Sequence, residues 1–156
     1  MESTTHDTAG VVTYPPLIYV AGLAAGRLLQ ALAPLKFLPR AWTKPLSGLL
    51  TGVALLLAGW AGLSLLRANT AIDPHRPTTA IVTTGPYKYT RNPIYLSFTL
   101  GYTGLAARAN SLWTMLLLPV VLLVLRRGVI EREERYLARK FGDEYLRYTG
   151  HVRRWL

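Results

Sequence analysis

The feature that most constrains the fold is where the charged residues are missing. Residues 45–66 contain no Asp, Glu, Lys, Arg or His, and the same holds for residues 92–107 and 109–125. Only 17% of the 156 residues are charged, against about a quarter in a typical soluble domain. The sequence therefore predicts a polytopic membrane protein of the all-α class, with a single domain over residues 1–156, and excludes a disordered or fibrous chain.

Four apolar segments are expected to cross the membrane as helices. Residues 46–66 would span about 31 Å as a helix, which is close to the thickness of the hydrocarbon core of a bilayer. Residues 17–33 form a second span, in which Arg27 is expected to reach toward the interface. Residues 93–107 and 111–126 are shorter and are expected to form an antiparallel helical hairpin.

Small residues and prolines in these segments carry further expectations. Glycines should permit close helix packing, and the candidates are Gly52, Gly59, Gly62, Gly101 and Gly104. Pro45 is expected in the first turn of its helix, where proline is tolerated, and Pro119 is expected to kink the last span.

Positive charge is concentrated on one side of the predicted bundle. With four crossings, 13 of the 18 Lys and Arg residues and all 8 acidic residues fall on the side that carries both termini. The positive-inside rule then places both termini in the cytoplasm, as in a bacterial inner membrane protein. Orientation and contact with the lipid bilayer thus explain the net charge of +10. A nucleic-acid partner is not expected, because no groove-reading or RNA-binding motif is present.

The polar side chains suited to chemistry lie in two segments on that side, residues 67–92 and 127–156. In the first, several prolines preclude a continuous helix and Gly85 supplies a turn. Asn92 is expected to cap the following helix, with Pro93 at its first position. The exposed N–H groups of that helix start, together with Arg91, would form an anion site.

The second segment is predicted to form an interfacial helix over residues 129–141 that ends at Gly142. Glu133 and Glu134 interrupt its apolar face, so one of these carboxylates must lie near that face. A carboxylate there needs a cationic partner, which is either an arginine or a ligand. The anion site and this carboxylate together suit a zwitterionic ligand.

Several other chemistries have no support in the sequence. The chain has no cysteine and its three histidines are not spaced as a metal set, so no metal site is expected. No glycine-rich nucleotide loop is present, and no Ser/His/Asp arrangement can be defended from spacing.

The chain resembles a known family in two motifs that follow one another in order. The first is Thr84-Gly-Pro-Tyr-Lys-Tyr-Thr-Arg-Asn-Pro-Ile-Tyr95, and the second begins Glu131-Arg-Glu-Glu-Arg-Tyr-Leu and continues to Trp155. Over residues 69–156 the sequence is similar to the isoprenylcysteine carboxyl methyltransferases and phospholipid methyltransferases, integral membrane enzymes that use S-adenosylmethionine (SAM). Many relatives read Arg-His-Pro where this chain has Asn92 in the middle position.

The resemblance implies a SAM pocket built from the cytoplasmic loop, the start of the third span and the C-terminal helix, with a side opening to lipid. Matching positions imply that the cofactor is lined by Val82, Thr83, Gly85, Tyr87, Arg91, Asn92, Pro93, Tyr95, Glu133, Glu134 and Leu137. Arg91 is expected to bind the methionine carboxylate. Glu134 is expected to bind the α-ammonium, with Glu133 as the second choice.

On the substrate side, Arg153 or Arg154 would orient a carboxylate acceptor, and His151 would take a proton from an amine or a thiol. The expected function is methyl transfer from SAM to a lipophilic or amphipathic small molecule, with the acceptor atom and the oligomeric state left open. The alternative is a non-catalytic membrane scaffold or lipid-binding protein of the same fold. Its small-residue helix faces and basic tail would favour that alternative.

Overall fold

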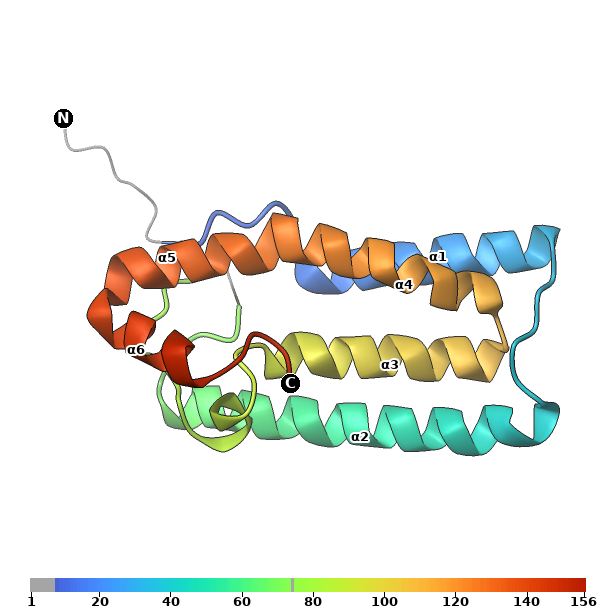
Figure 1. Ribbon diagram of the computed structural model, residues 1–156, viewed down its shortest axis with the longest axis horizontal. Helices are drawn as coiled ribbons and strands as arrows, with labels where there is room; N and C mark the ends of the chain where they lie inside the picture. Colours follow the sequence, from blue (N-terminus) through green and yellow to red (C-terminus); the bar gives the residue numbers. More distant parts are fainter. Residues whose placement is uncertain (1–7, 74) are drawn as a thin grey trace.

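A computed structural model describes residues 8–73 and 75–156, and within them the chain is all-helical, as the sequence predicts. Six α-helices are connected by short loops and by two single turns of other helix types (Figure 1). The helices are α1 Pro15–Leu32, α2 Arg40–Arg67, α3 Pro93–Ala109, α4 Leu112–Leu125, α5 Glu131–Phe141 and α6 Asp143–His151. The turns are the 3₁₀ turn η1 Gly85–Lys88 and the π-helical turn η2 Arg126–Ile130.

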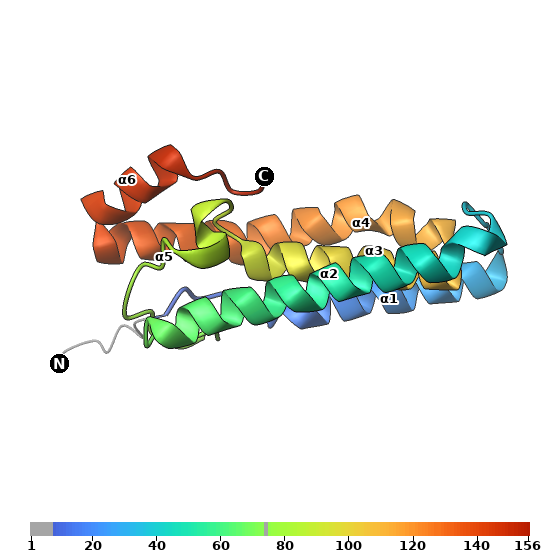
Figure 2. The same cartoon turned by 90° about the horizontal axis from the view of Figure 1, so that it is seen from below.

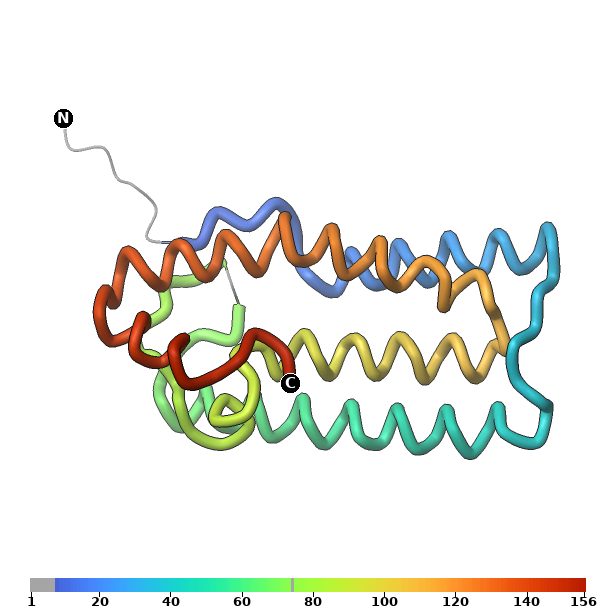
Figure 3. Tube along the Cα trace, in the orientation of Figure 1, coloured from blue at the N-terminus to red at the C-terminus, as the bar shows by residue number. Residues whose placement is uncertain are grey.

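Helices α1 to α4 lie side by side and alternate in direction (Figures 1 and 2). Consequently the segment before α1, the long loop between α2 and α3, and the chain after α4 all gather at one end of the bundle. Figure 3 shows the loop and the C-terminal tail winding past one another at this end. The opposite end has only the connection over residues 33–39 and the turn at Asn110 and Ser111. This arrangement brings the two chemically varied segments of the sequence together.

Three helical segments are long and apolar enough to cross a membrane, namely Pro15–Leu32, Arg40–Arg67 and Leu112–Phe141. The third is the continuous run of α4, η2 and α5. Its apolar part ends at Leu125, so the charged η2 and α5 extend beyond the membrane-spanning stretch. Helix α3 has 17 residues and lies among these three.

Helix α2 begins earlier than expected. It starts at Arg40, directly after Pro39, instead of at residue 46, and it has 28 residues. Pro45 therefore lies inside the helix and not in its first turn, which corrects the expectation for this residue. Apolarity alone could not locate this start, because Arg40 and Lys44 belong to the helix but not to its apolar stretch.

The expected hairpin of α3 and α4 exists, but each helix packs mainly on another partner. Helix α3 packs most extensively on α2, and α4 on α1. The turn between α3 and α4 holds Asn110 in the left-handed region, with φ of 47°. The side-chain oxygen of Asn110 accepts hydrogen bonds from the backbone N–H groups of Phe37 and Leu38, at 3.1 and 2.9 Å. This turn is therefore fastened to the connection between α1 and α2.

Close helix packing uses Gly104 from the expected set of glycines, together with two glycines of α1 that were not expected. A Cβ atom at Gly104 would lie 2.8 Å from Thr51 Oγ1, so this glycine permits the contact of α3 with α2. Gly22 and Gly26 do the same for α1 against its neighbours. By contrast, Gly52 and Gly59 have open space around them, so the expectation for these two positions was wrong. The composition of α2 did not reveal which of its faces meets α3.

The C-terminal segment forms a further helix, α6, after α5. Gly142 ends α5 with a φ of 52°, as expected for a C-terminal glycine, and α6 follows immediately. Helix α6 folds back so that residues 152–155 return to the start of α3 (Figure 2). Residues 145–155 are therefore part of the structure around the loop.

Candidate functional site

A cavity of about 410 Å³ lies at the end of the bundle where the loop, α5 and α6 meet. Its volume is in the range of sites for cofactors and other small molecules. Its wall is mostly apolar, with charged groups and tyrosines from several elements. The lining residues are Ala9, Tyr14, Pro15, Pro16, Leu65, Ala71, Ile72, Asp73, Thr78, Ala80, Ile81, Val82, Tyr87, Arg91, Asn92, Pro93, Ile94, Tyr95, Phe98, Glu133, Glu134, Tyr136, Leu137, Tyr145 and Tyr148.

The loop that forms one wall is fixed to α2 and to α6. Gly85 has a φ of 60°, and a Cβ atom there would meet the Ser64 hydroxyl and lie 3.1 Å from the Trp60 indole nitrogen. Only glycine satisfies both the conformation and the space. On the other side, the Tyr148 hydroxyl donates a 2.7 Å hydrogen bond to the Tyr87 carbonyl. The backbone around Tyr87 is therefore held between two helices.

The start of α3 is also fastened by the C-terminal tail. Asn92 occupies the N-cap position before Pro93, as expected, but its side chain makes no capping hydrogen bond. The Asn92 Nδ2 group instead donates to the Arg154 carbonyl at 3.0 Å, and the Thr90 hydroxyl donates to the same carbonyl at 3.1 Å. The backbone N–H of Arg91 donates to the Arg153 carbonyl at 2.9 Å. The position of Arg91 therefore depends on the tail.

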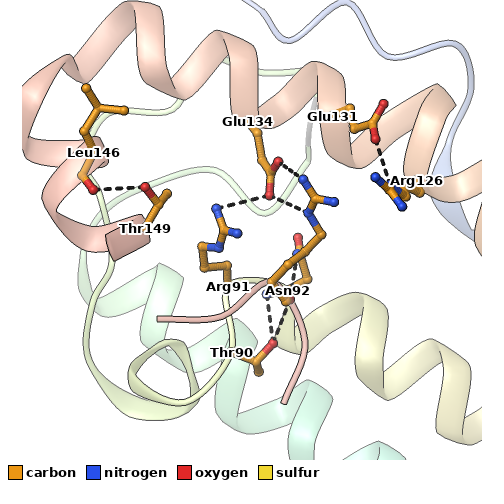
Figure 4. A network of polar contacts seen from close by, with 9 residues as sticks. Thr90, Arg91, Asn92, Arg126, Glu131, Glu134, Leu146 and Thr149 are labelled. Atoms are coloured by element: carbon orange, nitrogen blue, oxygen red, sulfur yellow. Dashed lines mark hydrogen bonds and ion pairs between the residues drawn. The ribbon is translucent and has the colours of Figure 1, made fainter. Parts of the chain in front are cut away.

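Arg91, Glu134 and Arg154 form a cluster of two cations and one anion. Arg154 binds Glu134 through two parallel contacts, from Nε to Oε1 at 2.9 Å and from Nη2 to Oε2 at 2.6 Å. Arg91 makes a single, longer contact with Glu134, from Nη1 to Oε1 at 3.3 Å (Figure 4). Arg91 Nε is the only buried side-chain nitrogen or oxygen in the described ranges that has no hydrogen-bond partner.

Glu133 has a different environment from its neighbour Glu134. It accepts a 2.7 Å hydrogen bond from the Tyr95 hydroxyl, which joins α5 to the first turn of α3. Burial raises the pKa of Glu133 to about 7, against the lowering effect of the Tyr95 hydrogen bond. The nearby negative charge of Glu134 raises this pKa further. A cation bound in the cavity would favour the ionised form of Glu133.

Several tyrosines present rings or hydroxyl groups to the same cavity. Burial raises the pKa of Tyr145 to about 12 and also raises the pKa values of Tyr87 and Tyr148. These phenols therefore stay protonated at neutral pH. The rings of Tyr145 and Tyr148 lie 6.2 Å apart between centroids, on one face of α6. Aromatic faces of this kind suit a planar base or a cation.

Asp73 and Tyr14 also line the cavity. Asp73 Oδ1 accepts a hydrogen bond from the His75 backbone N–H at 2.9 Å and lies 3.2 Å from the His75 Nδ1 atom. These bonds lower the pKa of the Asp73 carboxyl group. The His75 ring also packs on Tyr14, with 4.2 Å between ring centroids.

Nine of the eleven residues predicted to contact a cofactor line this cavity. Thr83 is exposed, and Gly85 packs on α2 instead, so neither is part of the lining. Of the residues predicted on the substrate side, Arg154 is held by Glu134, while His151 and Arg153 are exposed and lie outside the lining. The His151 Nδ1 atom lies 2.7 Å from the Arg147 carbonyl.

Several residues that line the cavity were not predicted from the sequence. They are Tyr14, Asp73, Tyr136, Tyr145 and Tyr148. The spacing of Tyr145 and Tyr148 places them on one helical face, which is a signal that the sequence contains. In residues 8–73 and 75–156, no group of three or more His, Cys, Asp or Glu residues is placed to hold a metal ion.

The fold and the cavity define a helical protein with three candidate membrane spans in its described residues and a cofactor-sized internal site at one end of its bundle. Sequence comparison identifies the family. The phospholipid methyltransferase family (PEMT) matches residues 42–144, and the chain belongs to this family, as its motifs predict. The matched range includes α2 except for its first two residues, and all of the loop, α3, α4 and α5.

Two curated bacterial proteins are similar to the chain over 116 and 76 residues. The cobalt-zinc-cadmium resistance protein CzcN of Cupriavidus metallidurans is 34% identical over 116 residues, which cover 69% of this chain and 49% of that protein. The nickel-cobalt-cadmium resistance protein NccN of Alcaligenes xylosoxydans is 36% identical over 76 residues, or 47% of this chain and 36% of that protein. The match thus spans half or less of the length of either relative. An uncharacterized protein of Haemophilus influenzae is 57% identical over 37 residues.

Proposed function

We propose that the protein is a SAM-dependent methyltransferase of the membrane, acting on a lipophilic or amphipathic small molecule. One observation carries the proposal: a single cavity combines an arginine, a carboxylate and several tyrosines, and most of its lining residues lie in the range that matches the phospholipid methyltransferase family. The arginine would bind the carboxylate of SAM, the carboxylate would bind its ammonium group, and the tyrosine rings would pack on its adenosine. Membership of the family supports the same cofactor.

Within this proposal Arg91 binds the methionine carboxylate, because Arg91 lines the cavity and its buried Nε atom has no hydrogen-bond partner. Glu133 binds the α-ammonium in place of Glu134, the residue favoured from the sequence. Both oxygens of Glu134 already contact arginines. The change follows from geometry, since a carboxylate with two bound guanidinium groups has little capacity left for a further cation.

The bound cofactor would supply a methyl group on a positively charged sulfur, which is an activated leaving group. The residues of this chain have to align the acceptor with the methyl group and exclude water. Apolar side chains on the cavity wall, among them Ile81, Ile94 and Phe98, suit both the exclusion of water and a lipophilic acceptor. A carboxylate, an amine or a thiol remains a possible acceptor group. His151 and Arg153 would need the acceptor to extend beyond the cavity in order to contact it.

We further propose that α1 to α4 all cross the membrane and that both termini face the cytoplasm. The alternating directions of the four helices support this arrangement, since α1, α2 and the continuous run from α4 to α5 are each long and apolar enough to cross, and α3 is packed among them. The basic residues at the end with the cavity support the orientation. The cavity would then take its cofactor from the cytoplasm and its acceptor from the bilayer.

Calorimetric titration of the detergent-purified protein with S-adenosylhomocysteine, the demethylated form of the cofactor, tests the proposal. We expect saturable binding, and we expect Arg91→Ala to weaken it at least tenfold. Arg108→Ala is the matched control, because it removes an exposed arginine at the opposite end of the bundle. Protein that is folded by circular dichroism but binds no ligand at roughly millimolar concentration would exclude the proposed function.

The alternative is a non-catalytic protein of the same fold, and the names of the two longer relatives favour it, since they refer to metal resistance and not to methylation. Such a protein would bind a lipid or a partner helix. Native mass spectrometry distinguishes the two functions. A stoichiometric protein or lipid partner, in the absence of any binding of S-adenosylhomocysteine, would favour the alternative.

A further inference from the structure

We propose that Arg154 is a positioning residue: it engages Glu134 and thereby leaves the Arg91 guanidinium available to the carboxylate of the cofactor. The inference rests on the proposed function and assigns a role to a side chain that lies outside the main cavity. Three observations support it, namely the unequal sharing of Glu134, the charge balance of the cluster and the way in which the tail is held.

The sharing of Glu134 is unequal. Arg154 faces both carboxylate oxygens at 2.9 and 2.6 Å, which is the fork-to-fork geometry that gives the strongest arginine–carboxylate pair. Arg91 reaches only Oε1, at 3.3 Å. Arg154 therefore occupies the preferred bidentate approach to Glu134. Arg91 is restricted to a side contact and retains an unpartnered Nε atom.

The charge balance of the cluster also leaves Arg91 available to an anionic ligand. Two guanidinium groups against one carboxylate leave a net positive charge, and Arg91 is the member with a cationic side chain on the wall of the main cavity. In the described part of that wall, Arg91 is the only Lys or Arg residue. Without Arg154, Arg91 and Glu134 would form a neutral pair. The same Arg91 donors would then have to serve both Glu134 and the incoming carboxylate.

The tail is held by backbone contacts that do not involve the Arg154 side chain. The Arg154 carbonyl accepts hydrogen bonds from Thr90 and Asn92, and the Arg153 carbonyl accepts one from the Arg91 backbone. A truncated side chain at position 154 keeps all three of these bonds. The variant Arg154→Ala therefore isolates the effect of the guanidinium from the attachment of the tail.

The experiment compares two ligands in calorimetric titrations. S-adenosylhomocysteine has the amino-acid carboxylate, whereas 5′-methylthioadenosine keeps the adenosine and the thioether sulfur but lacks the amino-acid group. We expect Arg154→Ala to weaken S-adenosylhomocysteine binding about tenfold and to change methylthioadenosine binding by less than about twofold. Arg147→Ala is the matched control, because it removes an exposed arginine from α6.

A second variant tests the mechanism with S-adenosylhomocysteine alone. In the double variant Arg154→Ala/Glu134→Gln the amide no longer competes for Arg91 as an anion. We therefore expect affinity to return to within about threefold of the wild-type value. If Arg154 had a general structural role, the double variant would be no better than the single one, and both ligands would bind more weakly to Arg154→Ala.

The two proposals fail in different ways. If the wild-type protein does not bind S-adenosylhomocysteine, the proposed function is wrong. The role of Arg154 is wrong, while the function stands, if the wild type binds and any of three results appears: unchanged affinity in Arg154→Ala, equal loss for both ligands, or no recovery in the double variant. Thermal unfolding of each variant confirms that the compared proteins are folded.

Discussion

The Tyr95 hydroxyl donates a 2.7 Å hydrogen bond to Glu133, and this contact connects the first turn of α3 with the first turn of α5. The two residues are 38 positions apart in the sequence. Both line the cavity, and Glu133 is the carboxylate there that no arginine contacts in the described part of the chain. The Tyr95 hydrogen bond therefore holds this carboxylate on the cavity wall, where we propose that the α-ammonium of the cofactor binds.

We expect Tyr95→Phe to weaken S-adenosylhomocysteine binding about three- to tenfold. The phenol lowers the pKa of Glu133, so its removal raises that pKa and reduces the fraction of ionised carboxylate. Tyr102→Phe is the matched control, because it removes a buried hydroxyl that donates to Thr114 instead, away from the cavity. Calorimetry measures the affinities, and equal affinity in both variants would contradict a role for the Tyr95 hydrogen bond in ligand binding.

The affinity for S-adenosylhomocysteine should increase with pH. Glu133 has a pKa of about 7, so it is mostly protonated at pH 6 and mostly ionised at pH 8. An α-ammonium group binds the ionised form, and we expect an increase of about tenfold between these two pH values. In the Glu133→Gln variant this dependence should be lost. A wild-type profile that is flat, or that falls with pH, would show that Glu133 does not bind the ammonium.

The same pKa shift affects folding in the absence of ligand. The folded-state pKa of Glu133 lies above the ordinary 4.5, so the folded protein holds this proton more tightly than the unfolded chain does. The contribution of Glu133 to the free energy of unfolding is therefore fully present below about pH 4.5 and is lost as the pH rises through about 7. Thermal unfolding of wild type and Glu133→Gln across this range measures the difference.

The positions of the apolar segments could be predicted from the sequence because an uncharged stretch of membrane length has few alternatives. Which of Glu133 and Glu134 is available to bind an ammonium group could not be predicted from the sequence. Adjacent helical residues point in directions about 100° apart, so the choice requires the register of α5 relative to α4. The π-helical turn η2 at Arg126–Ile130 changes that register, and nothing in the composition of this segment signals it.

The contacts of Gly85, and the presence of Asp73 and Tyr14 in the cavity wall, also could not be predicted from the sequence. The motif containing Gly85 indicated a cofactor contact, but the residue packs on Trp60 and Ser64, which precede it by about twenty positions or more. Asp73 and Tyr14 come from different elements, and both line the cavity because α1 begins at the end of the bundle where the loop lies. Contacts of this kind depend on tertiary packing, which local patterns do not report.

Packing of α3 on α2 leads to a prediction about stability. We expect Gly104→Ala to lower the free energy of unfolding by about 1–3 kcal/mol, because the new methyl group would press on Thr51 and on the Cβ atom of Leu50. At Gly101 a Cβ atom would lie 3.8 Å from Ala54, which is ordinary contact, so Gly101→Ala should be neutral or slightly stabilising. Thermal unfolding in detergent compares the two, and equal midpoints would contradict the packing described here.

The proposed orientation can be tested with single cysteines, because the chain contains none. Lys36 and Arg108 lie at one end of the bundle, and Arg76 and Arg147 lie at the other, so four basic side chains can be replaced one at a time. We expect Lys36→Cys and Arg108→Cys to react with a membrane-impermeant maleimide on intact bacterial cells whose outer membrane has been opened. Arg76→Cys and Arg147→Cys should react only after the inner membrane is permeabilised, since the positive-inside rule places them in the cytoplasm.

The reverse pattern of labelling would show that the orientation is inverted and that the cavity lies outside the cell. If Lys36 and Arg108 lay on different sides, then α2 and α3 would not both cross the membrane, and the four-span arrangement would be wrong.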